Sequence, residues 1–198
     1  MLHRGAQLRT TDTAGFSLLE LVIAMTVTLV VMVAASTLLA TSLRTRTREH
    51  ARSDALASAQ RALNIMSREI GNAGYGLNDN GIVVDDSNAA SIRVRSNLNN
   101  NATLNEPDED VRFVFQSANR AIVRVDNSGG SVVLATNITR LTITYLNVAG
   151  GGASPGTAER VAIDVAVDLP AGPEQPASVV RLPSQVALRN APNTLQQF

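Results

Sequence analysis

The stretch GFSLLELVIAMTVTLVVMVAASTLLATSL, residues 15–43, combines a long apolar run with one carboxylate, Glu20. No charged residue lies between Leu21 and Leu43, and about 20 apolar residues suffice to span a bilayer as a helix. A cleavable secretory signal has a shorter apolar core of roughly 7–15 residues, so we expect 16–43 to be a retained transmembrane helix. An acid in such a segment costs roughly 2.5–3.5 kcal/mol at its centre and less near its end. Glu20 therefore needs a reason to be there.

The composition of the 198-residue chain excludes several function classes. There is no cysteine, which removes disulfides and zinc–thiolate sites. The only histidines are His3 and His50, too few for a metal site built from several histidines and little basis for a histidine-based catalytic triad. Basic and acidic residues number 17 each, and aromatic residues make up 3% of the chain. Neither a basic surface nor a stacking platform for nucleic acid is expected.

The residues GFSLLE followed by an apolar helix resemble the type IV prepilin motif of pilins and of type II secretion pseudopilins. The resemblance implies that residues 1–15 are a leader, which a prepilin peptidase removes after Gly15, and that the new terminal residue, Phe16, is N-methylated. It also implies that Glu20 pairs with the terminal ammonium group of a neighbouring subunit, since two charges that are costly alone in apolar surroundings offset one another as a pair. The alternative is a carboxylate that reaches headgroup water at the membrane interface.

Arginines near the ends of the apolar run bear on its orientation. Arg4 and Arg9 precede the run, whereas Arg44, Arg46, Arg48 and Arg52 follow it. Counted alone, these charges would place the carboxy-terminal side in the cytoplasm. The prepilin resemblance implies the opposite: a single pass through the inner membrane, with the rest of the chain in the periplasm and later in a filament.

The helix is expected to continue beyond the membrane as residues 44–71, because no proline or glycine interrupts the chain from Phe16 to Ile70. Gly71 is a natural carboxy-terminal cap, and Gly74 and Gly76 suit positive φ angles. Arg44, Arg48 and Arg52 share one face of this half. They are expected either to bind lipid phosphates or acidic groups of a partner, or to form a solvated face where the helix leaves the membrane. Past these arginines, apolar residues spaced three and four apart form one stripe that is predicted to pack on a sheet, and its members are Leu56, Ala59, Leu63, Met66 and Ile70.

From about Gly81 the apolar residues alternate with polar ones, as in half-buried antiparallel strands. We expect a head at 72–190 and a flexible tail at 191–198. The fold class is therefore α+β, with a long amino-terminal helix packed on an antiparallel sheet. Strands are predicted at 82–84, 91–95, 111–116, 121–125, 131–136, 140–146, 160–169, 178–181 and 185–189.

Two further segments resemble minor subunits of the same family. LNIMSREIGNAGYG, residues 63–76, resembles the end of the first helix in PilW-type minor pilins, whose turn contains Ala-Gly-Tyr. VVRLPSQVALRN, residues 179–190, resembles the last strand of both PilW-type and J-type (PulJ-like) heads. Many PilW-type heads contain cysteines, which this chain lacks. The resemblance implies a non-enzymatic minor pilin of a type IV pilus, with other pilins and the assembly machinery as partners. The alternative is a J-type minor pseudopilin of type II secretion.

A membrane-anchored enzyme or a calcium-binding adhesin head is the remaining reading. Calcium prefers several oxygen ligands from one short loop, and carboxylates do gather at two places in the head. Neither place completes a calcium-loop pattern, so solvated loops are expected, with no metal and no cofactor. The glycine-rich 150–156 and proline-rich 169–176 read as surface connections. The carboxylates at the first of the two acidic places are those of Asp79, Asp85 and Asp86, and at the second those of Glu106, Asp108, Glu109 and Asp110.

Overall fold

The computed structural model describes residues 15–101, 103–104, 106–171 and 176–191. The predicted leader, apart from Gly15, and the predicted tail, apart from Ala191, lie outside the described residues. Part of the proline-rich loop, 172–175, also lies outside them. The chain divides into two compact units, Met1–Thr45 and Arg46–Phe198.

Helix α1 spans Leu18–Gly71 and accounts for 54 residues. It ends at the glycine that was expected to end it, and the turn that follows contains Gly74 and Gly76 with φ angles of 78° and 71°. Both angles lie in the left-handed region that favours glycine. The acid of the first turn is Glu20 and the basic residue of the last turn is Arg68, which both suit the helix dipole.

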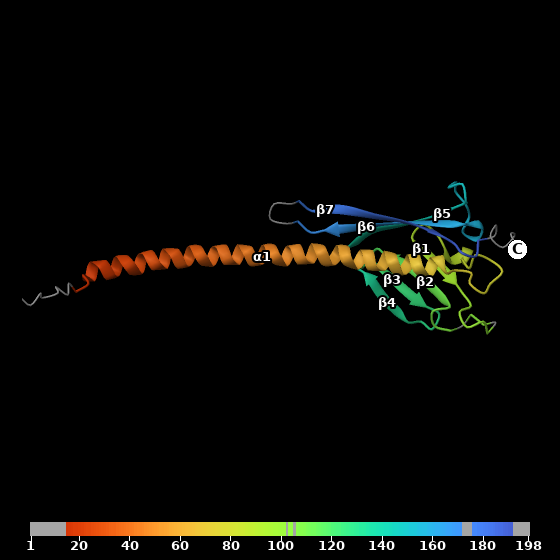
Figure 1. Ribbon diagram of the computed structural model, residues 1–198, viewed down its shortest axis with the longest axis horizontal. Coiled ribbons are helices and arrows are strands. Elements are labelled where there is room, and N and C mark those ends of the chain that lie inside the picture. The colour runs from red at the N-terminus through yellow and green to blue at the C-terminus, as the bar shows by residue number, and fades with distance from the viewer. Residues whose placement is uncertain (1–14, 102, 105, 172–175, 192–198) are drawn as a thin grey trace, which may run out of the picture. The chain divides into compact units, whose positions relative to one another are not determined.

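The head contains two antiparallel sheets rather than the single sheet expected (Figure 1). Only Thr136 and Asn137 separate the last strand of one sheet from the first strand of the other. Asn137 has a φ of 59°, a conformation that asparagine tolerates better than most residues, and the chain leaves the first sheet there. The first sheet has the order β1 (Ser91–Arg95), β2 (Asp110–Gln116), β3 (Ala121–Asp126), β4 (Ser131–Ala135). The second has the order β5 (Ile138–Leu146), β6 (Arg160–Leu169), β7 (Ser178–Ala187).

Two strand predictions were wrong. Residues 82–84 form no strand: Ile82 makes an isolated bridge to Val94, and a short 3-10 helix, η1, occupies Val84–Asp86. The predicted strands 178–181 and 185–189 are one strand, β7, which continues through Pro183. β7 lies at the edge of its sheet, where a residue without an N–H is tolerated if it faces away from the neighbouring strand.

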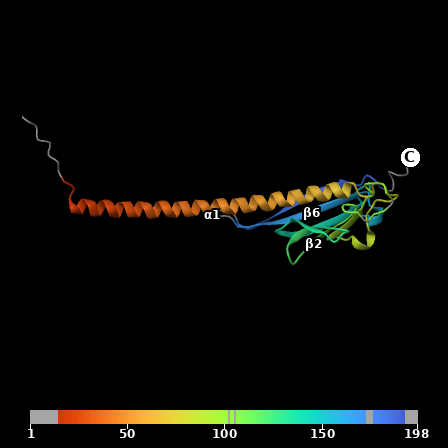
Figure 2. The same cartoon turned by 90° about the horizontal axis from the view of Figure 1, so that it is seen from below.

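The core forms where the second half of α1 packs on both sheets, which lie on the same side of it in Figure 2. The predicted stripe is right except for Leu56, which is 38% exposed. Its neighbour Ala55 takes the inward position instead, because one residue turns a helix by about 100° and Ala55 lies four residues before Ala59. The sheets contribute buried side chains such as Ile92, Phe113, Ile122, Ile138, Ile163 and Val165.

Polar contacts also join the helix to the strands. Arg124 of β3 donates to Glu69 of α1, with 3.0 Å between Nε and Oε2, and pairs with Asp108 as well. The hydroxyls of Ser67 and Ser184 lie 3.1 Å apart between α1 and β7. These contacts are partly exposed and add modestly to the apolar packing.

Candidate functional site

The predicted cleavage point lies just before the helix. Gly15, Phe16 and Ser17 are not helical, and α1 starts at Leu18. A side chain added at Gly15 would meet no atom within 4 Å, so nothing in the described structure requires glycine there. A requirement for glycine at this position would then come from a partner, such as the predicted peptidase, that binds the extended backbone too closely for a side chain.

Ser17 caps the start of α1. Its backbone oxygen accepts a hydrogen bond from Leu21 N at 3.1 Å, and its Oγ accepts one from Leu19 N at 3.3 Å. Serine is a preferred residue at this position because it satisfies an N–H that has no partner within the helix. This role of Ser17 was not predicted from the sequence, although Ser17 and Glu20 have the S-x-x-E spacing of a capping box.

The Glu20 carboxylate interacts favourably with the dipole of its own helix but has no side-chain partner among the described residues. It lies in the first turn, where a negative charge interacts favourably with the helix dipole by about 0.3–1 kcal/mol. Among the described residues, no hydrogen bond or ion pair to the Glu20 side chain is found. The capping-box bond back to Ser17 N is likewise not made, so the carboxylate is exposed and available to a group outside the chain.

The apolar part of α1 is exposed on every side. α1 is long and apolar enough to cross a membrane, and none of its most apolar 18-residue window is buried within the chain. Hydroxyls in this part donate to carbonyls three or four residues earlier, as Thr28 does to Ala24 O at 2.7 Å, so they need no water. The same contact is made by Thr26, Ser36, Thr37 and Thr41. This surface requires apolar surroundings, either a bilayer or other helices.

The predicted turn after α1 is tightly packed around its two glycines. A Cβ on Gly74 would lie 2.4 Å from Asp79 O, and one on Gly76 would lie 2.8 Å from Asn97 O. Tyr75 between them is held by its backbone, since Tyr75 O accepts from Asn97 N at 2.7 Å. Its side chain is nevertheless 61% exposed. The turn therefore presents an exposed aromatic ring on a backbone that is closely packed and hydrogen-bonded.

The segments 63–76 and 179–190 meet at this turn. Asn190, at the end of the second segment, donates through Nδ2 to Gly74 O at 2.7 Å, Leu77 O at 2.8 Å and Asp79 O at 2.6 Å. Just before it, Arg189 N donates to Gly71 O at 3.4 Å. One side-chain amide thus ties the end of the last strand to the turn after the helix, more than 110 residues away in the chain.

Most of the acidic residues singled out in the head accept hydrogen bonds or form ion pairs within the protein. Asp110 is buried and accepts from Arg93 at 2.7 Å and from Arg95 at 2.8 Å, and Asp86 pairs with Arg93 at 2.6 Å. Burial opposes ionisation of Asp110, but the hydrogen bonds from the two arginines outweigh it and hold the pKa of Asp110 below its usual value. In the first acidic cluster, Asp79 accepts from Gly81 N at 2.8 Å.

Glu106 and Glu109, in the loop that leads into β2, also accept hydrogen bonds from their own surroundings. Glu109 is buried and accepts from Leu98 N at 2.9 Å, and Glu106 accepts from the side-chain amides of Asn99 and Asn101. Within the described ranges, no group of three or more histidine, cysteine or acidic residues is arranged to hold a metal ion. The contacts of these acids are those of loop-stabilising groups.

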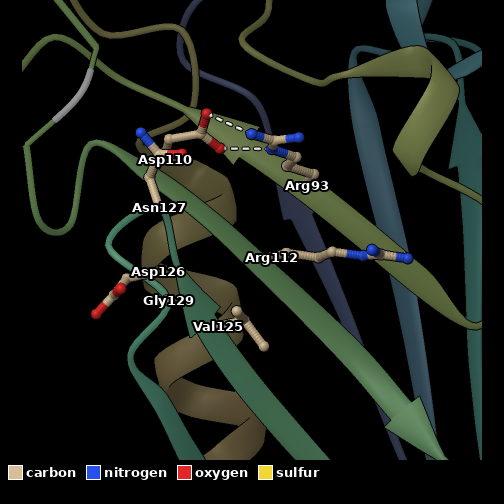
Figure 3. A pocket seen from close by; sticks show the side chains of 7 residues that line it. All are labelled: Arg93, Asp110, Arg112, Val125, Asp126, Asn127 and Gly129. Carbon is tan, nitrogen blue, oxygen red and sulfur yellow. Dashed lines mark hydrogen bonds and ion pairs between the residues drawn. The ribbon is translucent and has the colours of Figure 1, made fainter.

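A shallow cleft of about 220 Å³ lies on the first sheet near the β3–β4 turn (Figure 3). Arg93 and Asp110 point toward each other across it, whereas Arg112 and Asp126 point away from that pair. Arg112 donates through Nε to Ser91 Oγ at 2.9 Å. The charged side chains that line the cleft do not converge on one point, and none of the lining residues is a serine, cysteine or histidine nucleophile. The arrangement is that of an ion-paired surface.

Arg52, one of the three arginines expected to share a helix face, contacts the head. Its NH1 donates to Pro170 O at 2.8 Å, in the described part of the proline-rich loop 169–176. Arg48 lies one turn earlier and is exposed. Arg52 therefore supports the helix–sheet contact and is not simply a solvated charge.

Comparison with known families gives one match, to the prokaryotic N-terminal methylation motif at residues 11–36. The comparisons with curated proteins and with solved structures returned no match. The motif covers the predicted cleavage point, Phe16, Glu20 and most of the apolar run. It is the motif of type IV prepilin-like proteins, which are structural rather than enzymatic.

The motif and the fold together define the class of the protein. A single amino-terminal apolar helix followed by antiparallel sheets is a type IV pilin-like architecture. The methylation motif at the start of that helix indicates a type IV pilin-like or pseudopilin-like protein. The motif implies processing by a prepilin-type peptidase and a pilus or pseudopilus assembly machinery, and the single amino-terminal apolar helix fits a membrane-anchored pilin.

Proposed function

We propose that the protein is a PilW-type minor pilin, which enters or initiates a type IV pilus after cleavage behind Gly15 and N-methylation of Phe16. Before assembly it sits in the inner membrane by its single helix, with the head in the periplasm. The observation that carries the proposal is the methylation motif at the start of an apolar helix that no part of the described chain covers.

Glu20 has a specific role in this proposal. Its open carboxylate pairs with the methylated ammonium group of Phe16 in a neighbouring subunit. A terminal ammonium close to the start of a helix adds positive charge to the positive end of the helix dipole. A carboxylate from a neighbour offsets that charge, and each pair formed sets the register between two subunits.

The turn after α1 supports the PilW type. Gly74 and Gly76 cannot be replaced without strain, and Asn190 ties the turn to the end of the last strand. These residues belong to the two segments that resemble PilW-type subunits. The segment 179–190 resembles J-type heads equally well, so a J-type minor pseudopilin is the second candidate.

Deletion of the gene separates the two candidates. For a PilW-type subunit, the deletion strain should have few surface pili and reduced twitching, while protein secretion continues. A helical filament grows easily once begun, but its first subunits lack neighbours for their Glu20-type charges, so loss of an initiating subunit has a large effect. Normal piliation with exoproteins retained in the periplasm would overturn the PilW assignment in favour of the J type.

A further inference from the structure

Four strands lie at the edges of the two sheets: β1, β4, β5 and β7. Loop backbone covers two of these edges, since Val83 N donates to Arg93 O of β1 at 2.9 Å and Ile143 N of β5 donates to Ala89 O at 2.8 Å. β7 is interrupted by Pro183, which has no N–H to offer. Covered edges and edge prolines are the usual means by which proteins prevent pairing with another chain.

The edge of β4 has neither protection. Asp126 N donates to Gly130 O at 2.9 Å at the β3–β4 turn, and hydrogen-bonded pairs alternate along an antiparallel ladder. Arg124 and Val132 are therefore the next hydrogen-bonded pair. The backbone groups of Ser131 and Val133 point outward, and no backbone partner for them occurs among the described residues.

The side chains of β4 favour contact rather than solvent. Val132 is 57% exposed and Val133 is 58% exposed. Val132 is paired with Arg124 and Val133 with Val123, so the two valines lie on opposite faces of the sheet. Residues 127–138 contain no charged side chain, whereas β7 carries Arg181. In Figure 1, β4 forms the outer margin of its sheet.

We propose that the free edge of β4 is a docking site for an extended, uncharged strand from the head of another pilin-type subunit. The outward N–H and C=O groups specify a strand as occupant, because only an extended backbone can pair with both in register. The absence of charge over 127–138 specifies an uncharged segment, since a charged strand would lose hydration there without gaining a partner. Apolar side chains at two consecutive positions of the incoming strand would contact the valines on both faces.

The source of the strand rests on the proposed function. Subunits that associate through the exposed apolar part of α1 bring their heads near one another, and the unprotected edge is then available to a neighbour. Pairing along β4 would continue the first sheet into the next subunit. It would also protect an edge that otherwise invites aggregation.

The test is cross-linking of the full-length chain in its own host. Ser131→p-benzoylphenylalanine places a photoreactive group on β4, and the same group at Val179 on β7 is the matched control. We expect irradiation to join the β4 probe to a protein that carries its own N-methylated amino terminus, through an extended uncharged segment. The control at Val179 should give at least tenfold less of this product.

Two substitutions test whether the edge backbone is responsible. Val133→Pro removes an outward N–H without touching the pairing with β3, and Val133→Lys adds an edge charge at a side chain that is already exposed. Each should reduce the cross-linked product about tenfold. A product with a second copy of this chain, a product with a protein that is not pilin-like, no product, or a product that survives both substitutions would overturn the inference. Methylation of Phe16, measured in the same samples, reports on the proposed function separately.

Discussion

Removal of the Asn190 side-chain amide tests how the two ends of the head are joined. Asn190→Ala leaves the carbonyl oxygens of Gly74, Leu77 and Asp79 without their shared donor. The amide has two N–H groups, and a net hydrogen bond contributes about 0.5–1.5 kcal/mol. We therefore expect the free energy of unfolding to fall by about 1–3 kcal/mol. For a domain of this size that corresponds to a fall in Tm of roughly 2–12 °C.

The measurement is urea unfolding of the fragment 46–198, followed by circular dichroism. This fragment is the second compact unit and lacks the apolar run, so we expect it to be soluble and folded. Asn190→Asp should destabilise it more than Asn190→Ala, because a carboxylate would then face the three carbonyls. Asn127→Ala, at an exposed turn residue, is the matched control and should change stability by less than about 0.5 kcal/mol. Equal stability of Asn190→Ala and the unaltered fragment would refute this account of the turn.

Three other substitutions test separate parts of the structure. Leu63→Asp should prevent folding of the fragment, because it buries an unpaired charge against the sheets, whereas Leu56→Asp on the exposed side of α1 should be tolerated in the same unfolding assay. Glu20→Ala should leave membrane insertion and cleavage intact but reduce incorporation into filaments, measured by immunoblot of sheared pili; normal incorporation would contradict the charge-pairing proposal. Because the pKa of Asp110 is lowered in the folded head, its contribution to stability is complete above the unfolded-state value of about 4 and is lost progressively as the pH falls from there through the lower folded-state pKa. Asp110→Asn should therefore flatten the acid limb of a stability–pH curve, and an unchanged limb would show that the Arg93 pair does not stabilise the head.

Local patterns in the sequence predicted the fold class, the end of α1 and most of the strands. The helix was predictable because no proline or glycine interrupts it before Gly71, and the alternation in 160–169 marks β6. The division into two sheets was not predictable, because no local pattern marks the break between β4 and β5, where Asn137 takes a left-handed conformation. β7 was predicted as two strands because proline usually ends a strand, and only its edge position makes Pro183 acceptable.

The candidate site was partly readable from the sequence. Gly15, Phe16 and Glu20 are predicted from one short motif, and their roles stay predictions; Gly15 and Phe16 lie just before the exposed helix and Glu20 lies in its first turn. The cap formed by Ser17 was missed, although the S-x-x-E spacing signals it. The contact of Asn190 with the turn at Gly74 joins residues 116 apart. No local pattern reports such a contact, since it depends on how the last strand packs beside the helix.

Mass spectrometry of the mature protein from its host shows directly whether the leader is removed and the new amino terminus is methylated. We expect a chain that starts at Phe16 and carries one methyl group on its terminal amine. A mature chain that starts at Met1, or one cut after Ser36 as a secretory signal would be, would contradict this prediction.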